Sequence, residues 1–195
     1  TWCGPCIETI PHVSKLAKQH QDIIFIGVSV LEESKDDNIK RFVEKMGDKM
    51  SYRVGYSGNK DGMAKTWLKA ASQDGIPTAF IVKDGIVQWI GHPSKLDKPL
   101  GELNAGTFDL NASKTAFEAE LQATKDRREA DAAFSAVVSL RGSGNKQGAA
   151  AALVQAVRKY PRLSDSAERV RYEWLAEDDG QAWLRQTEAL TASGK

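Results

Sequence analysis

Short apolar runs separated by polar turns appear along residues 22–90, a pattern typical of an α/β protein. Residues 22–30 hold an uninterrupted run rich in β-branched and aromatic side chains, which predicts a buried strand. Residues 78–83 and 86–90 flank an Asp-Gly pair, which predicts a hairpin. A shorter strand is predicted over residues 51–56. The pattern therefore predicts a mixed central sheet.

Amphipathic helices are predicted between these strands. A capping box at residues 34–37 precedes apolar positions at helical spacing, and Gly47 ends that pattern. Another helix is predicted over residues 63–71, with Trp67 in the core; its apolar face consists of Met63, Ala64, Trp67, Leu68 and Ala71. We expect these helices to flank the sheet.

The chain changes character after about residue 105. Of its 24 alanines, 18 follow residue 109. A long helical pattern runs through Phe117 and Leu121 to Leu140, and the turn residues 142–145 stop it. We therefore expect a domain over residues 1–107 and an all-α region over residues 108–195.

The helical region has two interpretations. After the turn, the spacing of Ala149, Leu153, Ala156 and Pro161 matches the second half of a tetratricopeptide-like helix pair. Residues 165–177 and 181–190 predict two more amphipathic helices, without a recurring period. The region is therefore either such a helix pair, with a surface for docking a partner, or a small bundle.

Charge excludes two classes of partner. The net charge is +1, with 14 basic and 14 acidic residues up to residue 109 and 13 and 12 after it. Neither part carries the basic patch of a nucleic-acid-binding or membrane-surface protein. No apolar run approaches the roughly 20 residues of a membrane span. We expect no nucleic-acid partner and no membrane contact within this chain.

Both cysteines lie in one motif, Trp2-Cys3-Gly4-Pro5-Cys6. Two intervening residues allow the sulfurs to bond when the first cysteine begins a helix, where the helix dipole stabilises a thiolate. We predict that Cys3 is the exposed nucleophile and that Cys6, one turn inward, is shielded. Pro5 suits the first turn, Gly4 allows close approach of a partner, and Trp2 lines one side.

Two other interpretations of the pair are weaker. Zinc usually takes four ligands, so a zinc site would need two more from His12, His20, His92 or carboxylates. A purely structural disulfide across so short a loop would restrict the unfolded chain less than a long loop does. We expect neither a metal nor any other cofactor.

A second motif supports redox chemistry. Gly75-Ile76-Pro77-Thr78 precedes the predicted strand at residues 78–83. Together with Trp2-Cys3-Gly4-Pro5-Cys6, and with Pro11 five residues on, this motif resembles the thioredoxin superfamily over residues 1–105. The added strand and helix between the motifs are most similar to the extracytoplasmic TlpA/ResA-type branch.

The resemblance implies a fold, a site and a function. It implies a cis Pro77 against the disulfide, with the Ile76 backbone pairing with a bound substrate strand. It also implies a thiol-disulfide oxidoreductase acting on protein disulfides, with an upstream thiol electron donor and a periplasmic or otherwise extracytoplasmic location. The family places a central strand just before the first motif. Because the sequence begins at Thr1, we expect that strand to be missing and the chain to be poorly stable.

Two other functions remain open. One is a client-binding module that uses the helical region, with a secondary redox pair. The other is a thiol peroxidase, although Cys3 lacks the Pro-x-x-x-Thr-x-x-Cys setting of that relative. His92 follows Gly91 near the rim of the implied site, where a cation could lower the pKa of a thiol, but a surface histidine is the simpler interpretation.

Overall fold

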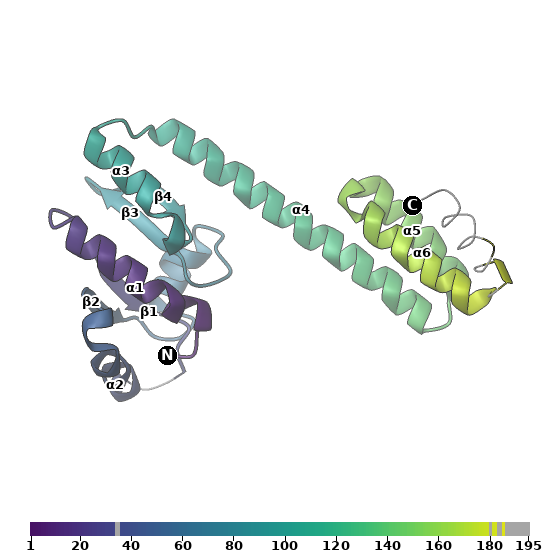
Figure 1. The fold of residues 1–195 in the computed structure, drawn as a ribbon, viewed down its shortest axis with the longest axis horizontal. Coiled ribbons are helices and arrows are strands. Elements are labelled where there is room, and N and C mark those ends of the chain that lie inside the picture. Colours follow the sequence, from purple (N-terminus) through teal and green to yellow (C-terminus); the bar gives the residue numbers. More distant parts are fainter. Residues whose placement is uncertain (34–35, 180, 183–184, 186–195) are drawn as a thin grey trace. The chain divides into compact units, whose positions relative to one another are not determined.

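A computed structural model describes residues 1–33, 36–179, 181–182 and 185 of the protein. They form a mixed α/β part followed by helices (Figure 1). The chain divides into two compact units, Thr1–Leu121 and Gln122–Lys195. The division lies inside the helix α4, Leu110–Gly142, which begins just after the predicted boundary at residue 107.

The strands form two separate sheets. In one, β1 (Ile26–Ser29) pairs in parallel with β2 (Arg53–Tyr56). In the other, β3 (Ala79–Lys83) pairs antiparallel with β4 (Ile86–Gly91), so the predicted hairpin is confirmed. The prediction of one mixed sheet is wrong for the described residues, because each ladder stops at two strands and no described strand joins them.

Neighbouring residues determine the hairpin turn, whereas a distant partner strand determines where the first strand begins. Asp84 and Gly85 have φ of 53° and 75°, the left-handed pair that a two-residue hairpin turn requires. Strand β1 is shorter than the predicted 22–30, because its pairing with β2 begins at Ile26. The residues just before it lack a strand partner, and Ile24 is 74% exposed.

Helices surround the sheets of the first unit. The longer ones are α1 (Gly4–Gln19), α2 (Asp36–Met46) and α3 (Asp97–Ala105). Short 3-10 turns are η1 (Gly47–Lys49) and η3 (Pro93–Lys95). Helix α2 confirms the predicted pattern, although Ser34 and Lys35 of the capping box lie outside the described residues.

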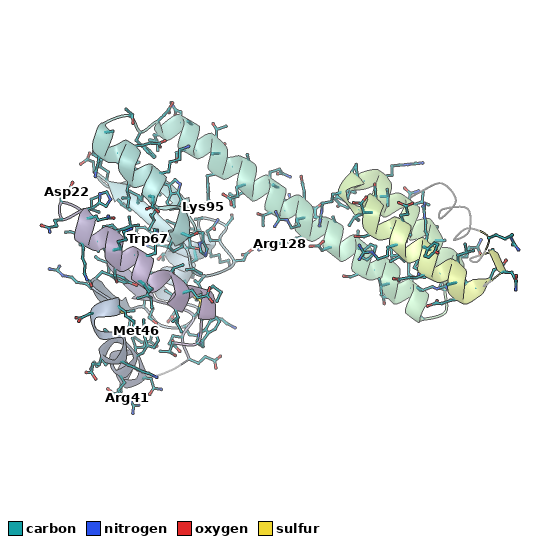
Figure 2. The ribbon with its side chains drawn as sticks, viewed as in Figure 1. Asp22, Arg41, Met46, Trp67, Lys95 and Arg128 are labelled. Carbon is teal, nitrogen blue, oxygen red and sulfur yellow. A yellow bond between two sulfur atoms is a disulfide. The ribbon has the colours of Figure 1, made fainter. Side chains whose placement is uncertain are left out.

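The helix predicted over residues 63–71 is present as a π-helix, whose turns are wider than those of an α-helix. Residues Ala64–Lys69 form the π-helix η2, whose Trp67 is half-buried. The Trp67 ring meets Phe80 of β3 edge-on, with 5.2 Å between ring centroids; Figure 2 labels Trp67. This contact attaches η2 to the hairpin sheet.

The main core of the first unit lies between two helices and the hairpin. Leu16 of α1 and Leu100 of α3 are fully buried and cluster with Leu96. Ile81 of β3 and Trp89 of β4 pack against that cluster. Helices α1 and α3 thus cover one face of the β3–β4 sheet, side by side (Figure 1).

The second unit is helical. It contains the later part of α4, then α5 (Lys146–Lys159), the short η4 (Pro161–Leu163) and α6 (Ser164–Asp178). The predicted stop after α4 is confirmed, since Gly144 has a φ of 85°. The helix predicted over residues 181–190 falls mostly outside the described residues.

Small side chains allow these helices to approach closely. Ala149 and Ala156 of α5 are buried as their spacing predicts, and so are Ala130 of α4 and Ala167 of α6. Leu153 of α5 is completely buried and clusters with Val137 and Ala167. Small side chains allow helix axes to lie close together. The buried residues of these helices give the second unit a core of its own.

Candidate functional site

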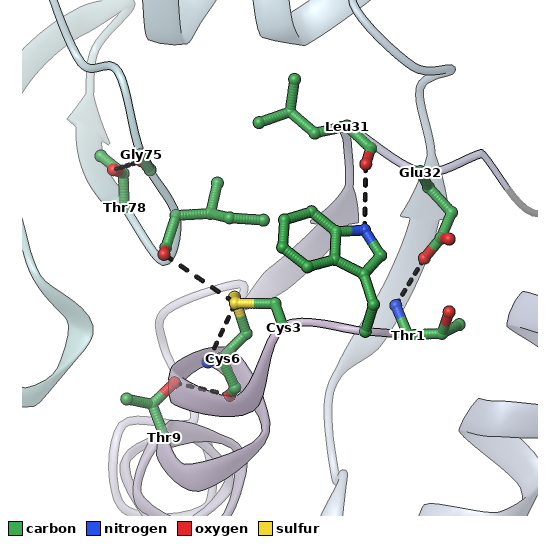
Figure 3. Close-up of a disulfide and its surroundings, with 10 residues drawn as sticks. Thr1, Cys3, Cys6, Thr9, Leu31, Glu32, Gly75 and Thr78 are labelled. Atoms are coloured by element: carbon green, nitrogen blue, oxygen red, sulfur yellow. Dashed lines mark hydrogen bonds and ion pairs between the residues drawn. A yellow bond between two sulfur atoms is a disulfide. The ribbon is translucent and has the colours of Figure 1, made fainter.

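The two cysteines form a disulfide at the start of α1. The sulfurs are 2.05 Å apart and the Cα atoms 5.2 Å apart. Cys3 is the N-cap of the helix, and the Cys6 backbone N–H donates to Cys3 Sγ over 3.2 Å (Figure 3). Pro5 occupies the first turn, where a missing N–H costs nothing. The predicted place of Cys3 at a helix start is confirmed.

The predicted order of exposure is wrong. Cys3 is 7% exposed and therefore buried, whereas Cys6 is only half-buried. Gly4 and Pro5, between them, are exposed. The reason is tertiary: Cys3 precedes the helix and lies against a distant loop, whereas Cys6 lies on the first turn.

That distant loop is the second motif. The Ile76–Pro77 peptide bond is cis, as the resemblance implies. The Ile76 carbonyl oxygen lies 3.8 Å from Cys3 Sγ, although 73 positions separate the two residues. Thr78 Oγ1 donates to the Gly75 carbonyl oxygen over 2.9 Å and closes the turn of this loop. The structure thus brings the two sequence motifs together.

A third segment joins the site. Trp2 is 61% exposed, and its Nε1 donates to the Leu31 carbonyl oxygen over 3.0 Å. Beside it, Glu32 is 3% exposed and accepts from the amino group of Thr1, as drawn in Figure 3. Sequence reasoning missed Leu31 and Glu32. Their position just after a predicted strand was an available signal, since functional groups gather at the carboxyl ends of strands.

Helix α1, which carries the disulfide, is hydrogen-bonded within its first turns and to the segment before β2. Thr9 Oγ1 donates to the Cys6 carbonyl oxygen over 2.8 Å inside the first turns of α1. Further along, Ser14 Oγ is buried and bridges α1 to the segment before β2. The helix that carries the disulfide is thus fixed at several points along its length.

The three histidines contact polar side chains other than the cysteines. His12 Nε2 lies 3.0 Å from Asp97 Oδ2, and the His20 ring contacts Asn104 over 2.8 Å. His92 contacts the Ser94 hydroxyl over 2.7 Å.

Over the part of the chain that the structure describes, no cluster of three or more metal-ligating side chains occurs. The cysteines are bonded to each other, so the chemistry that this arrangement offers is a dithiol/disulfide cycle.

Comparisons with known proteins found no relative. No protein-family model matches the chain, and no match was found among curated proteins or solved structures. Within the described segments, every helix is too short or too polar to cross a membrane.

Proposed function

We propose that the protein is a thiol-disulfide oxidoreductase with a thioredoxin-like fold, most similar to the TlpA/ResA-type branch. The observation that carries the proposal is the Cys3–Cys6 disulfide at the N-terminus of α1, with the carbonyl of Ile76 and the cis Pro77 beside it. A purely structural cross-link needs no helix N-terminus and no loop against one sulfur. A dithiol catalyst uses both.

The helix start supports a thiolate at Cys3. The N–H of Cys6 already points at the Cys3 sulfur, and the positive end of the helix dipole adds to its effect. In the proposed cycle, the Cys3 thiolate attacks a partner disulfide, forms a mixed disulfide and releases one partner thiolate. The Cys6 thiolate then attacks Cys3 Sγ, releases the second partner thiolate and closes the Cys3–Cys6 bond.

The partners follow from this chemistry. The substrates are protein disulfides, whose backbone would pair with the chain at Ile76. Because the cycle leaves the site oxidised, an upstream thiol donor must reduce it again. By resemblance, we place the reaction in the periplasm or another extracytoplasmic space.

The test is turnover of a protein disulfide. Insulin is incubated with the protein and a thiol reductant, and release of its reduced chains is followed. We expect Cys3→Ser to abolish turnover and Cys6→Ser to accumulate a mixed disulfide, because resolution is then blocked. Glu8→Gln, at an exposed position on the same helix, is the matched control and should keep the wild-type rate. Equal rates with and without Cys3 would overturn the proposal.

The direction of electron flow has a separate test. The Cys3–Cys6 pair is equilibrated with defined dithiol buffers and its free thiols are trapped. A reduction potential near or below about −250 mV identifies a reductant, the direction that we propose. A potential between about −120 and −180 mV identifies an oxidant or isomerase and reverses that direction.

A further inference from the structure

Leu31 has a backbone conformation that disfavours its own side chain. Its φ is 53°, in the left-handed region, where Cβ crowds the following carbonyl group. Only two other described non-glycine residues share a positive φ, Ser72 and Asp84, and Asp84 lies in a hairpin turn that requires it. A branched aliphatic residue in this region persists only when its surroundings hold it there.

Hydrogen bonds to the N–H and to the carbonyl oxygen of Leu31 hold its backbone in place. Its N–H donates to the Asn59 carbonyl oxygen over 2.9 Å, just beyond a bond from the Ser57 N–H to the Ser29 carbonyl oxygen over 3.0 Å. These two bonds extend the pairing of β1 with β2 past the strand ends. The Leu31 carbonyl oxygen accepts from Trp2 Nε1, the dashed line at Leu31 in Figure 3.

The partner segment of Leu31 is a tight turn. Gly58 and Gly62 both have positive φ, at 75° and 49°. A Cβ added at Gly58 would lie 2.4 Å from an Asp61 carboxylate oxygen, and one at Gly62 would lie 2.8 Å from the Ser57 carbonyl oxygen. The turn therefore requires glycine at both positions, and it presents the Asn59 carbonyl oxygen to the Leu31 N–H.

The conformation of Leu31 affects the proposed redox site through the side chain of Trp2. Trp2 is 61% exposed, so core packing does not fix its indole, and the hydrogen bond to the Leu31 carbonyl oxygen orients it. The next residue is Cys3, which is 7% exposed although both of its neighbours in the chain are exposed. Because Trp2 directly precedes Cys3, an indole held in one orientation would limit the directions from which a reagent can approach that cysteine.

We propose that Leu31 is a positioning residue of the redox site. Its left-handed backbone directs its carbonyl at the Trp2 indole, and the held indole restricts access to Cys3 Sγ. The inference rests on the proposed function, in which Cys3 is the attacking sulfur, and it adds a residue that controls how readily Cys3 is reached.

The test compares three single variants of the full chain: Leu31→Val, Leu31→Gly and Trp2→Phe. Glycine adopts a positive φ without strain, whereas a β-branched residue there is costlier than leucine. Trp2→Phe keeps an aromatic ring and removes the donor. Reduced protein is alkylated with iodoacetamide, and mass spectrometry gives separate rates for Cys3 and Cys6. The limiting rate at high pH separates access from thiol ionisation.

We expect Cys3 alkylation to be about fivefold to tenfold faster in Leu31→Val and Trp2→Phe, because both lose the hydrogen bond that orients the indole, and the net free energy of one hydrogen bond corresponds to a change of up to about tenfold. Leu31→Gly should stay within about twofold of wild type, because its backbone remains left-handed. The Cys6 rate should not change in any variant. The double variant Leu31→Val/Trp2→Phe should be no faster than either single variant, because both remove the same hydrogen bond.

Other orders of reactivity overturn the inference. If Leu31→Gly alkylates faster than Leu31→Val, side-chain packing governs the site instead of the backbone. An unchanged Cys3 rate in Trp2→Phe means that the indole hydrogen bond does not control access; this variant keeps the test valid if Leu31→Val fails to fold. Alkylation needs no protein partner, so an absence of insulin turnover would count against the proposed function alone.

Discussion

Single buried polar groups tie helix α1, which carries the disulfide, to the rest of the first unit. Ser14 is the clearest case: its hydroxyl donates to the Lys49 carbonyl oxygen over 2.6 Å and accepts from the Ser51 N–H over 3.0 Å. It thus connects α1 with the segment that leads into β2. Removing such a hydroxyl leaves the Lys49 carbonyl and the Ser51 N–H, both in part-buried hydrogen bonds, without this partner, and a polar group shielded from water without a partner costs free energy.

Ser14→Ala should therefore lower the free energy of unfolding of the first unit by about 1–3 kcal/mol. Urea denaturation measures the change. Lys15→Ala, at the exposed neighbouring position of α1, is the matched control and should change stability by less than about 0.5 kcal/mol. A loss no larger than that of the control would show that the bridge does not stabilise the helix.

Two glycines with a positive φ allow the cost of backbone strain to be compared with the cost of steric crowding. Gly62 and Gly106 have φ of 49° and 69°. A Cβ at Gly62 would lie 2.5 Å from Ser57 Oγ, whereas a Cβ at Gly106 meets nothing within 4 Å. Gly106→Ala should cost about 1 kcal/mol from strain alone, and Gly62→Ala clearly more. Equal losses in urea denaturation would contradict the crowding at Gly62.

At the scale of elements, charged side chains join the ends of three helices in the second unit. Arg141 near the end of α4 makes two bonds to Asp178 at the end of α6, of 2.7 and 2.8 Å, and a third to Glu177. Lys146 at the start of α5 binds the same Asp178 carboxylate. The Arg141 guanidinium also lies over the Trp174 ring, 5.0 Å from its centroid.

The Asp178 cluster makes the stability of the second unit depend on pH. The hydrogen bonds from Arg141, and then those from Lys146, lower the pKa of Asp178 to about 2. A carboxyl with a depressed pKa in the folded state stabilises the fold above its unfolded pKa of about 3.9, and that contribution is lost as the pH falls through about 2.

Asp178→Asn should therefore flatten the decline in stability between about pH 4 and pH 2. Urea unfolding followed by far-ultraviolet circular dichroism at several pH values measures it. Glu173→Gln changes an exposed carboxylate on the same helix and should keep the wild-type slope. The same slope in Asp178→Asn and in the wild type would mean that the cluster is not formed in solution.

A smaller ionic group lies elsewhere in the second unit. The Tyr160 hydroxyl donates to Glu129 over 2.8 Å, and this bond, more than the nearby lysine charges, lowers the pKa of the Glu129 carboxyl. Tyr160 follows α5 and Glu129 lies on α4. This hydrogen bond joins the end of α5 to α4, and because it is only part-buried we expect it to contribute little free energy.

At the scale of the whole molecule, each unit has its own core. Leu16, Leu96 and Leu100 build that of the first unit, whereas Val137 and Leu153 lie in that of the second. The first unit also exposes large apolar side chains on and next to its two short sheets: Ile26, Val82 and Ile86 lie on strands, and Ile24 lies just before β1. Short strands with open edges and exposed apolar residues favour association with other chains.

We therefore expect the chain to unfold in more than one step and to self-associate. Trp fluorescence and far-ultraviolet circular dichroism should give urea transitions that do not coincide, because the two cores are separate. Sedimentation should show an apparent mass that rises with concentration. One cooperative transition of a monomer, seen equally by both probes, would contradict this expectation.

Local sequence signals predicted most of the elements. Helix α2, the 84–85 hairpin turn and the break after α4 follow from periodicity and turn residues within a few positions of each other. The same kind of signal placed Cys3 at a helix start, whereas Pro77 was singled out by the resemblance to a known family. The strand at residues 22–30 was overestimated, because its apolar run says nothing of where a partner strand begins.

The sequence by itself determined the helices, the hairpin and the pairing of two cysteines one turn apart, since these depend on neighbouring residues. The tertiary structure alone decided that Cys3 is more buried than Cys6, that Ile76 meets its sulfur, and that Leu31 holds Trp2. It also decided that the strands form two sheets instead of one. Burial and long-range hydrogen bonds depend on which distant segments come together, and local patterns do not specify that.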